Sequence, residues 1–379
     1  MILELNEQQK MIRNMVREFA EKEVRPRAAE LDEKEEYPHE SLKKMAELGI
    51  LGTIIPQEYG GAGLDNVTYS MLLEEISRAC ASTGVVTSVH NSLAAWPIMN
   101  YGTEEQKKKY LPILARGEKI GAFGGTEPNA GSDLGAMQTT AELKGDKYII
   151  NGSKTFITSG PKAGIIIVFA VTDKEAGSKG ISAFIVESDF KGYSVGGIFD
   201  KIGINASLTS ELVFEDMEVP KENLLGKEGE GFKIALSTLD GGRIGIAAQA
   251  VGIAQAALDE SIEYSKNRQQ FGRPLAKFQA IQWMIAEMAT KVEAARFLVR
   301  SASYRKDKGE RISKDAAMAK LYASEIASWC ADKAIQVHGG YGYTKEYPVE
   351  RLYRDARITQ IYEGTSEVMK MVIAGTLLR

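Results

Sequence analysis

The segment Ile361-Tyr-Glu-Gly-Thr-Ser-Glu367 places one carboxylate, Glu363, among apolar neighbours just before a helical pattern over residues 368–378. A carboxylate in apolar surroundings has its charged form destabilised, so its pKa rises toward the range that suits a general base. An acidic residue near a helix N-terminus is also favoured by the helix dipole, which is a purely structural explanation. From these residues alone, both interpretations of Glu363 stay open.

Two further segments combine charge with glycine. In Asp240-Gly-Gly-Arg243 the two charged residues share one helical face and can form a salt bridge. Two glycines inside a helix cost about 1 kcal/mol each relative to alanine, which suggests that something packs closely there, such as a ligand. In Asn267-Arg-Gln-Gln-Phe-Gly272, Arg268 could hold a phosphate and Phe271 could cover a ring, or the segment is simply a solvated helix end.

Two glycine-containing segments could bring backbone close to a ligand. Thr126–Asp133 (TEPNAGSD) offers small residues and hydroxyls whose backbone N–H groups could face an anion or a ring carbonyl, or it is an ordinary turn. Gln336–Gly342 (QVHGGYG) follows a helical pattern, whereas a dinucleotide-binding fingerprint follows a strand and opens a helix. Its glycine pair permits close approach of a ligand, but a helix C-cap followed by a turn is equally consistent.

The composition excludes several other chemistries. The chain has 379 residues with 47 basic and 51 acidic side chains, a net charge of −4, which argues against binding of nucleic acid. The 3 His form no HExxH and the 2 Cys form no CxxC, so neither a metal site nor a disulfide framework is expected. No GxSxG marks a serine hydrolase. The reactive groups of an enzyme with this sequence are therefore carboxylates or a bound organic cofactor.

The hydrophobic patterns indicate a mainly α protein with a middle β domain. Apolar residues recur at helical spacing over 6–117, with helices expected at 41–48 and 68–78 and a capping box at Thr103–Gln106. Short β-rich runs follow at 148–150, 165–171, 181–186 and 211–214, and helical stripes return after Phe232, one of them at Met318, Leu321/Tyr322, Ile326 and Trp329. We therefore predict an N-terminal α-helical domain (1–120), a middle β domain (121–228) and a C-terminal α-helical bundle (229–379).

The chain carries no sign of membrane insertion or export. Its N-terminus lacks a basic region followed by an apolar core, so no signal peptide is expected. The longest apolar run, Ile165–Val171, is far shorter than the roughly 20 residues that span a bilayer. These features predict a cytoplasmic protein.

Three motifs in one order resemble those of the acyl-CoA dehydrogenase family, and the likeness covers nearly the whole chain. They are TEPNAGSD, QVHGGYGYTKEYPVERLYRD and IYEGTSE. The resemblance implies the acyl-CoA dehydrogenase-like fold, with an N-terminal helical domain, a β-barrel-like middle domain and a C-terminal four-helix bundle. Gly125 stands where the family usually has an aliphatic residue, Asn205 where Arg is frequent, and Phe156 where a Trp is common.

The family resemblance also implies the chemistry and the residues that carry it. Glu363 is the expected catalytic base, which removes the α-proton of an acyl-CoA thioester while a hydride leaves the β-carbon for non-covalently bound FAD. Some family members carry the base at the position of Gly242, so its absence there leaves Glu363 as the sole candidate. The FAD-binding residues implied by position are Phe123, Gly125, Thr126, Ser132, Phe156, Ile157, Thr158, Arg268, Phe271, Gln279, Gln336, Val337, Gly339, Gly340, Thr365, Ser366 and Glu367. The implied substrate-binding residues are Ser132, Asp240, Arg243 and Gly364.

The resemblance further implies two kinds of protein partner. Arg268, Phe271, Gln279 and the Gln336–Gly340 stretch are expected to hold the pyrophosphate and adenosine of FAD across a subunit contact. A homotetramer is therefore expected, with electrons passing from reduced FAD to an electron-transfer flavoprotein.

The acyl group is expected to lie against Ser82–Trp96 (STGVVTSVHNSLAAW). This segment has no Arg or Lys, so a dicarboxylic substrate lacks a partner, and a short-chain thioester such as butyryl-CoA is the expected substrate. Alternatively, His90 and Trp96 shape the pocket for a branched or alicyclic acyl group. Three other classes stay open: an acyl-CoA oxidase, which is typically longer, a flavin monooxygenase on the same fold, and a non-catalytic acyl-CoA-binding protein.

Overall fold

Helices form the first part of the computed structural model, which describes residues 5–378. The predicted helices at 41–48 and 68–78 are confirmed, and the capping box predicted at Thr103 is present, with its side chain accepting from the backbone N–H of Gln106. Between α5 and α6 the chain stays helical in a π-helical stretch, Val89–Ala95. The helices of this part are α1 (Glu7–Phe19), α2 (Ala28–Lys34), α3 (His39–Glu47), α4 (Asn66–Ala79), α5 (Ala81–Ser88), α6 (Trp96–Tyr101) and α7 (Glu104–Ala115).

The middle of the chain forms an eight-stranded sheet in the order β6-β7-β3-β2-β4-β5-β8, with β1 parallel to β4. The four predicted β-rich runs lie within β3, β4, β5 and β7. Sequence reasoning missed β1 and β6, which each contain two glycines, and the charged β2, because these residue types are depleted in strands. The strands are β1 (Ile120–Gly124), β2 (Thr140–Lys144), β3 (Lys147–Thr158), β4 (Ala163–Val171), β5 (Ile181–Glu187), β6 (Tyr193–Ile198), β7 (Thr209–Pro220) and β8 (Leu224–Leu225).

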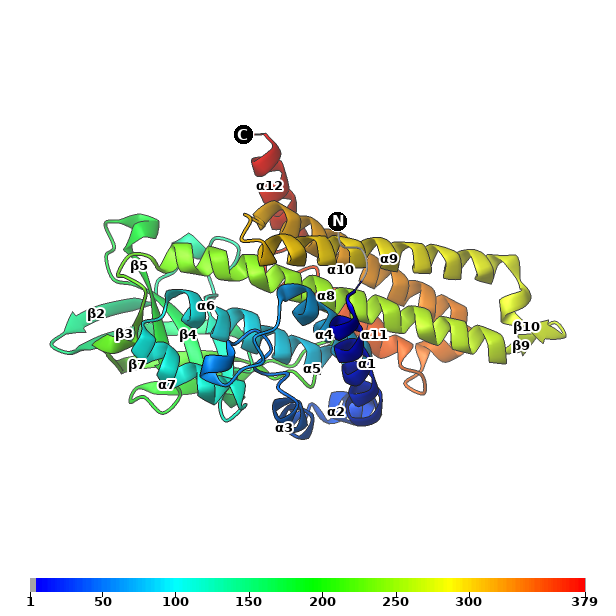
Figure 1. Cartoon of the computed structure of the whole chain (residues 1–379), viewed down its shortest axis with the longest axis horizontal. Helices are drawn as coiled ribbons and strands as arrows, with labels where there is room; N and C mark the ends of the chain where they lie inside the picture. Colours follow the sequence, from blue (N-terminus) through cyan, green and yellow to red (C-terminus); the bar gives the residue numbers. More distant parts are fainter. Residues whose placement is uncertain (1–4, 379) are drawn as a thin grey trace.

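A helical bundle follows, and the long helix α8 (Gly231–Asn267) runs through the molecule from the sheet to the small β9–β10 hairpin (Figure 1). The other elements are β9 (Gln269–Gln270), β10 (Arg273–Pro274), α9 (Gln279–Asp307), α10 (Ser313–His338), α11 (Val349–Ile358) and α12 (Ser366–Leu377). The predicted N-terminal domain starts at residue 1 and the predicted bundle stops at residue 379. Residues 1–4 and 379 lie outside the described part of the chain. Within residues 5–378, no helix is both long and apolar enough to cross a bilayer.

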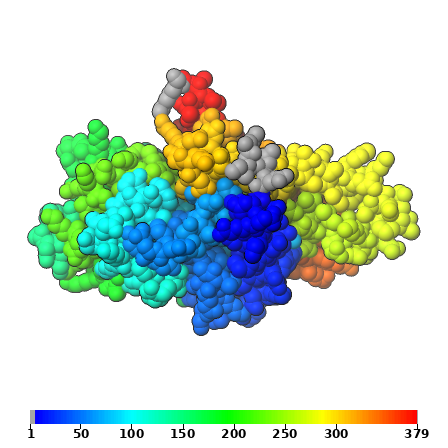
Figure 2. Space-filling view, viewed as in Figure 1, coloured from blue at the N-terminus to red at the C-terminus, as the bar shows by residue number. Residues whose placement is uncertain are grey.

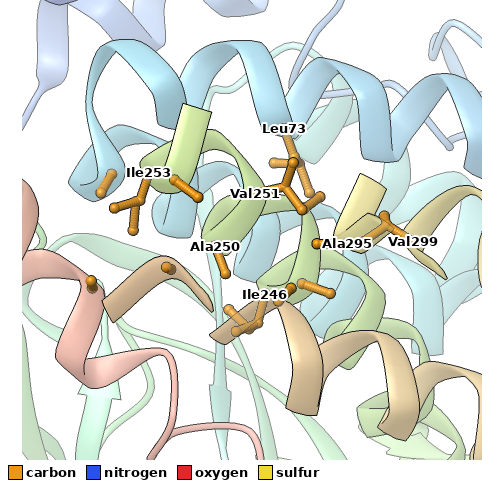
Figure 3. Close-up of a cluster of buried hydrophobic side chains, with 14 of the residues drawn as sticks. Leu73, Ile246, Ala250, Val251, Ile253, Ala295 and Val299 are labelled. Carbon is orange, nitrogen blue, oxygen red and sulfur yellow. The ribbon is translucent and has the colours of Figure 1, made fainter. Parts of the chain in front are cut away.

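The bundle core is built around α8 from small and β-branched side chains. Figure 3 shows Ile246, Ala250 and Val251 of α8 in one buried cluster with Leu73 of α4 and Val299 of α9. One predicted stripe needs correction: Met318 of α10 is 38% exposed, because the buried face of this helix consists mainly of alanines. Alanine side chains let helices approach closely. The positions of the larger apolar side chains therefore did not reveal which face of α10 is buried.

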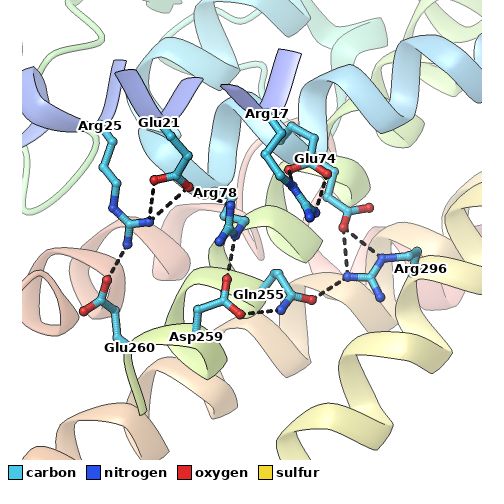
Figure 4. A network of polar contacts seen from close by, with 10 residues as sticks. Arg17, Glu21, Arg25, Glu74, Arg78, Gln255, Asp259, Glu260 and Arg296 are labelled. Atoms are coloured by element: carbon cyan, nitrogen blue, oxygen red, sulfur yellow. Dashed lines mark hydrogen bonds and ion pairs between the residues drawn. The ribbon is translucent and has the colours of Figure 1, made fainter. Parts of the chain in front are cut away.

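Charged side chains tie the N-terminal helices to the bundle (Figure 4). Arg78 of α4 pairs with Glu21 at 2.7 Å and with Asp259 of α8 at 2.6 Å. Arg296 of α9 pairs with Glu74 of α4 at 2.8 Å. These contacts fix α4 against α8, the helix that carries Asp240 and Arg243.

Candidate active site

The Glu363 carboxylate lies in the turn between α11 and α12 and points at α8. Both of its oxygens are buried and have no hydrogen-bond partner. A Cβ atom at Gly242 of α8 would lie only 2.2 Å from Oε2 of Glu363, so the glycine makes the room that the carboxylate occupies. The backbone of the turn is unusual, with φ values of +53° at Glu363 and +101° at Gly364. A non-glycine residue in this region is strained and is held there by its surroundings.

The charge state of this carboxylate is set by burial against two nearby cations. Burial raises the pKa of Glu363 to about 8, although Lys320 and Arg243 oppose the shift. Arg243 forms an ion pair with Asp240 at 2.7 Å, as the sequence pattern predicted, and its Nε has no partner. Lys320 of α10 was not predicted; it is fully buried, and Nζ donates to the Gly364 carbonyl oxygen at 2.6 Å. Glu363 is therefore a buried proton acceptor whose pKa lies near neutral pH, and Arg243 and Lys320 place two positive charges near it.

The walls around Glu363 come from α8 and from the Ser82–Trp96 segment. A Cβ at Gly242 would lie 2.7 Å from Cδ2 of Leu93, so this segment lies close to the carboxylate. Tyr362 donates its hydroxyl hydrogen bond to Gln249 of α8, and Gln249 in turn donates to the Ala81 carbonyl at 2.9 Å. Leu93 and this chain of hydrogen bonds hold the turn that carries Glu363 against α8.

Two further details concern the hydrogen bonds and charges of this segment. His90 is fully buried, with Nε2 bonded to the Leu114 carbonyl and Nδ1 accepting from the Gly121 N–H, both at 3.0 Å. Both ring nitrogens of His90 are therefore engaged by the protein backbone. The segment itself has no cation, but Nζ of Lys306 from α9 lies 5.1 Å from the Trp96 ring centroid. The absence of Lys and Arg from Ser82–Trp96 thus does not leave the neighbourhood without a positive charge.

A second cluster brings the TEPNAGSD segment next to the end of β3. The Thr155 N–H donates to the Thr126 carbonyl at 2.9 Å. Glu127 accepts from the backbone N–H groups of residues 138 and 139 and pairs at 2.7 Å with Lys154, a lysine with no exposed surface. Sequence reasoning missed this buried pair, although Lys154 lies in an otherwise β-rich run. It fixes Phe123–Ser132 against the strand that carries Phe156–Thr158.

Phe156 interrupts β3 and presents its ring at the surface. Its φ is +56°, and the strand register shifts between Lys154 and Ile157. The side chain is 63% exposed and contacts Phe199 at 4.6 Å between ring centroids. Phe123 instead packs inward against Phe169, with ring centroids 5.0 Å apart. An exposed aromatic ring on a strained backbone is a surface that a planar ligand can cover.

The remaining predicted residues divide into two groups. Thr365 caps α12 by accepting from the Val368 N–H at 3.3 Å, and beside it Ser366 has a buried hydroxyl without a partner.

Arg268 and Phe271 lie in the hairpin region that Figure 1 places at the end of the molecule opposite the sheet. Phe271 is 94% exposed, and the Arg268 guanidinium lies 5.6 Å from the Tyr341 ring centroid. This hairpin group also includes Gln279 at the start of α9 and Gln336, Val337, Gly339 and Gly340 at the end of α10. Within one chain, the two groups are not brought together.

Comparisons with known proteins agree with this architecture along the whole chain. Models of the acyl-CoA dehydrogenase N-terminal, middle and C-terminal domains match residues 6–118, 122–217 and 229–378. The chain is 58% identical to the short-chain specific acyl-CoA dehydrogenase of Clostridium acetobutylicum, over 99% of each chain. It superposes on butyryl-CoA dehydrogenase from Megasphaera elsdenii with a TM-score of 0.98 and 49% identity, covering 100% of both chains. It also matches a chain in the structure of the electron transferring flavoprotein of Acidaminococcus fermentans, with a TM-score of 0.99, 55% identity and full coverage of both chains. The chain therefore belongs to the acyl-CoA dehydrogenase family.

Proposed function

We propose that the chain oxidises a short-chain acyl-CoA thioester to the 2-enoyl-CoA and passes the electrons to an electron-transfer flavoprotein. The observation that carries this proposal is the Glu363 carboxylate, which is buried, without a hydrogen-bond partner and directed at Gly242. The short-chain specific relative and the butyryl-CoA dehydrogenase structure support the substrate class. The likeness to a chain in the electron transferring flavoprotein structure supports the electron acceptor. The cytoplasmic location stays a prediction from the sequence.

Glu363 would take the α-proton of the thioester. Its pKa of about 8 makes the carboxylate a stronger base than an exposed glutamate while leaving part of it ionised near neutral pH. Leu93 and Tyr362 would exclude water, which strengthens the electrostatic effect of Arg243 and Lys320 on the carboxylate. When bound, FAD supplies the hydride acceptor for the β-carbon. Ser132, Asp240, Arg243 and Gly364 are proposed to contact the CoA portion or the thioester.

The residues present fit a flavin. Ser366 has a buried hydroxyl and Arg243 a buried Nε, both without a partner, which is unfavourable unless a ligand or water supplies one. The exposed ring of Phe156 and the TEPNAGSD segment beside it offer one face and one edge for a planar ring. Phe123, Gly125, Thr126, Ser132, Phe156, Ile157, Thr158, Thr365, Ser366 and Glu367 would hold this part of FAD.

A second subunit would complete the cofactor site. Figure 1 places the β9–β10 hairpin, near Arg268, Phe271 and Gln279, at the end of the molecule away from β3, the strand that contains Phe156. This separation supports a cofactor site shared between two subunits. Figure 2 shows α12 projecting from the body of the molecule, and its Met371 and Leu377 are 71% and 66% exposed. These apolar surfaces support a homo-oligomer, and the homotetramer implied by the resemblance is the form we propose.

The test is a steady-state assay with electron-transfer flavoprotein and acyl-CoAs of increasing length and branching. We expect the highest kcat/KM for a four-carbon thioester and no turnover in E363Q. The exposed Glu36→Gln variant is the matched control and keeps wild-type activity. Full activity of E363Q in this assay would overturn the role of Glu363 as the base, and oxygen consumption without reduction of the electron-transfer flavoprotein would favour a flavin monooxygenase. Preference for a branched or alicyclic thioester would instead select the alternative acyl group.

A further inference from the structure

Lys320 is a buried lysine with no obvious structural reason to be charged. It has no exposed surface and lies on the alanine-rich face of α10, between the fully buried Ala316, Ala319 and Ala323. An ammonium group in such surroundings loses its hydration, which costs several kcal/mol unless hydrogen bonds and opposite charge offset the loss. Burial accordingly lowers the pKa of Lys320 to about 8. A side chain that only filled space at this position would be apolar.

The hydrogen bond of Lys320 falls on the turn that carries Glu363. Nζ donates to the carbonyl oxygen of Gly364 at 2.6 Å. Glu363 and Gly364 of this turn both have positive φ, a conformation that is strained for a non-glycine residue and persists only where neighbours hold it. Because the bond joins α10 to the carbonyl directly after Glu363, it restrains the direction in which the carboxylate points.

Two cations from neighbouring helices act on the Glu363 carboxylate. From α8, Arg243 faces it and is already paired with Asp240; from α10, Lys320 faces it with only a neutral carbonyl as partner. The other titratable groups nearby are the hydroxyls of Tyr69 from α4 and Tyr362 from the turn itself, with Glu367 of α12 beyond Lys320. Glu367 adds a second negative charge that acts on Lys320. Lys320 differs from Arg243 in that its hydrogen bond goes to the neutral Gly364 carbonyl and not to a carboxylate.

We propose that Lys320 is a positioning residue for the base: its hydrogen bond to Gly364 holds the turn that aims Glu363, and its charge keeps the buried carboxylate ionisable. This inference rests on the proposed role of Glu363 as the proton acceptor. Nothing in it requires Lys320 to contact the substrate or the flavin.

Three variants separate charge from packing. Lys320→Met removes the charge and the donor at similar volume, Lys320→Gln removes the charge but keeps a donor, and Lys320→Arg keeps both. Because the cation lowers the pKa of Glu363, its removal raises that pKa, and the acid limb of the kcat–pH profile moves to higher pH. For each unit of displacement, kcat at pH 7 falls about tenfold while KM changes little. K320R keeps the wild-type limb, and so does Lys174→Met, which removes an exposed lysine of the loop between β4 and β5.

A titration that does not depend on turnover decides the matter. The infrared difference spectrum between each protein and its own E363Q counterpart reports the protonation of Glu363 directly. We expect the midpoint in K320M, or in K320Q if K320M does not fold, to lie above the wild-type midpoint. An unchanged midpoint in a folded neutral variant overturns the role of Lys320. If wild type oxidises no acyl-CoA, the proposed function fails instead, and the infrared titration still tests Lys320.

Discussion

Gly242→Ala is the change that perturbs the proposed base most selectively. The new methyl group would lie 2.2 Å from Oε2 of Glu363 and 2.7 Å from Cδ2 of Leu93. Ordinary contacts need about 3.4 Å or more, so the carboxylate must retreat by about 1 Å. The end of the Glu363 side chain can move, and alanine favours the helix by about 1 kcal/mol over glycine, so the free energy of unfolding should change little.

The catalytic cost should be much larger than the cost in stability. A displacement of about 1 Å at a reacting group can cost on the order of 100-fold in rate, or about 2.7 kcal/mol of transition-state stabilisation. We expect kcat with butyryl-CoA to fall by this factor in G242A. The assay is steady-state turnover with electron-transfer flavoprotein, accompanied by thermal unfolding of the same preparations.

A matched control makes this result interpretable. Gly375→Ala places a methyl group in another helix, α12, with nothing within 4 Å. It should keep wild-type kcat while gaining the same helical preference. Wild-type kcat in a correctly folded G242A protein would refute the close contact between the carboxylate and α8.

Three further predictions concern the free energy of unfolding, two for buried charged residues and one for a helix cap. The pKa of Glu363 is about 8 in the folded protein, above its ordinary value of 4.5. The protonated side chain therefore contributes fully to the free energy of unfolding below pH 4.5, and this contribution is lost as the pH rises through 8. The loss is at most roughly 5 kcal/mol. E363Q should therefore exceed wild type in stability by a few kcal/mol at pH 9 and match it at pH 4 in urea unfolding; a constant difference would contradict this. Lys154→Met leaves Glu127 buried without its partner and should lose about 3–5 kcal/mol in the same assay, whereas a loss below 1 kcal/mol would mean that water reaches the carboxylate. Thr365→Ala removes the N-cap of α12 and should lower the free energy of unfolding by about 0.5–2 kcal/mol. An unchanged free energy of unfolding would mean that other contacts hold this helix end.

The order of helices, strands and helices could be predicted from the sequence because apolar periodicity is a local property. The capping box at Thr103 and the continuous apolar strand β4 depend on neighbouring residues alone. The strands β1 and β6 could not be predicted, since pairing with β4 and β7 stabilises segments whose glycines disfavour a strand. The buried face of α10 was misjudged for a similar reason, because close helix packing selects alanine over larger apolar residues.

The candidate site was predictable in part. The IYEGTSE motif singled out Glu363, but the carboxylate's lack of a partner and its contact with Gly242 depend on a turn folding back onto α8. Lys154 and Lys320 were missed because lysine is almost never fully buried unless it is paired. The signal that could have found Lys320 is its place within a run of alanines. The family resemblance already implied that the residues proposed to bind FAD are divided between two subunits, and the fold places β3 and the β9–β10 hairpin at opposite ends of the molecule.

The most direct measurement is anaerobic titration of the FAD-loaded wild-type protein and E363Q with butyryl-CoA. If Glu363 is the base, the flavin absorbance of the wild-type protein bleaches as the thioester is added. E363Q binds the thioester but keeps its oxidised flavin spectrum. Bleaching of E363Q at the wild-type rate, or no bleaching of the wild type by any acyl-CoA, would contradict this account.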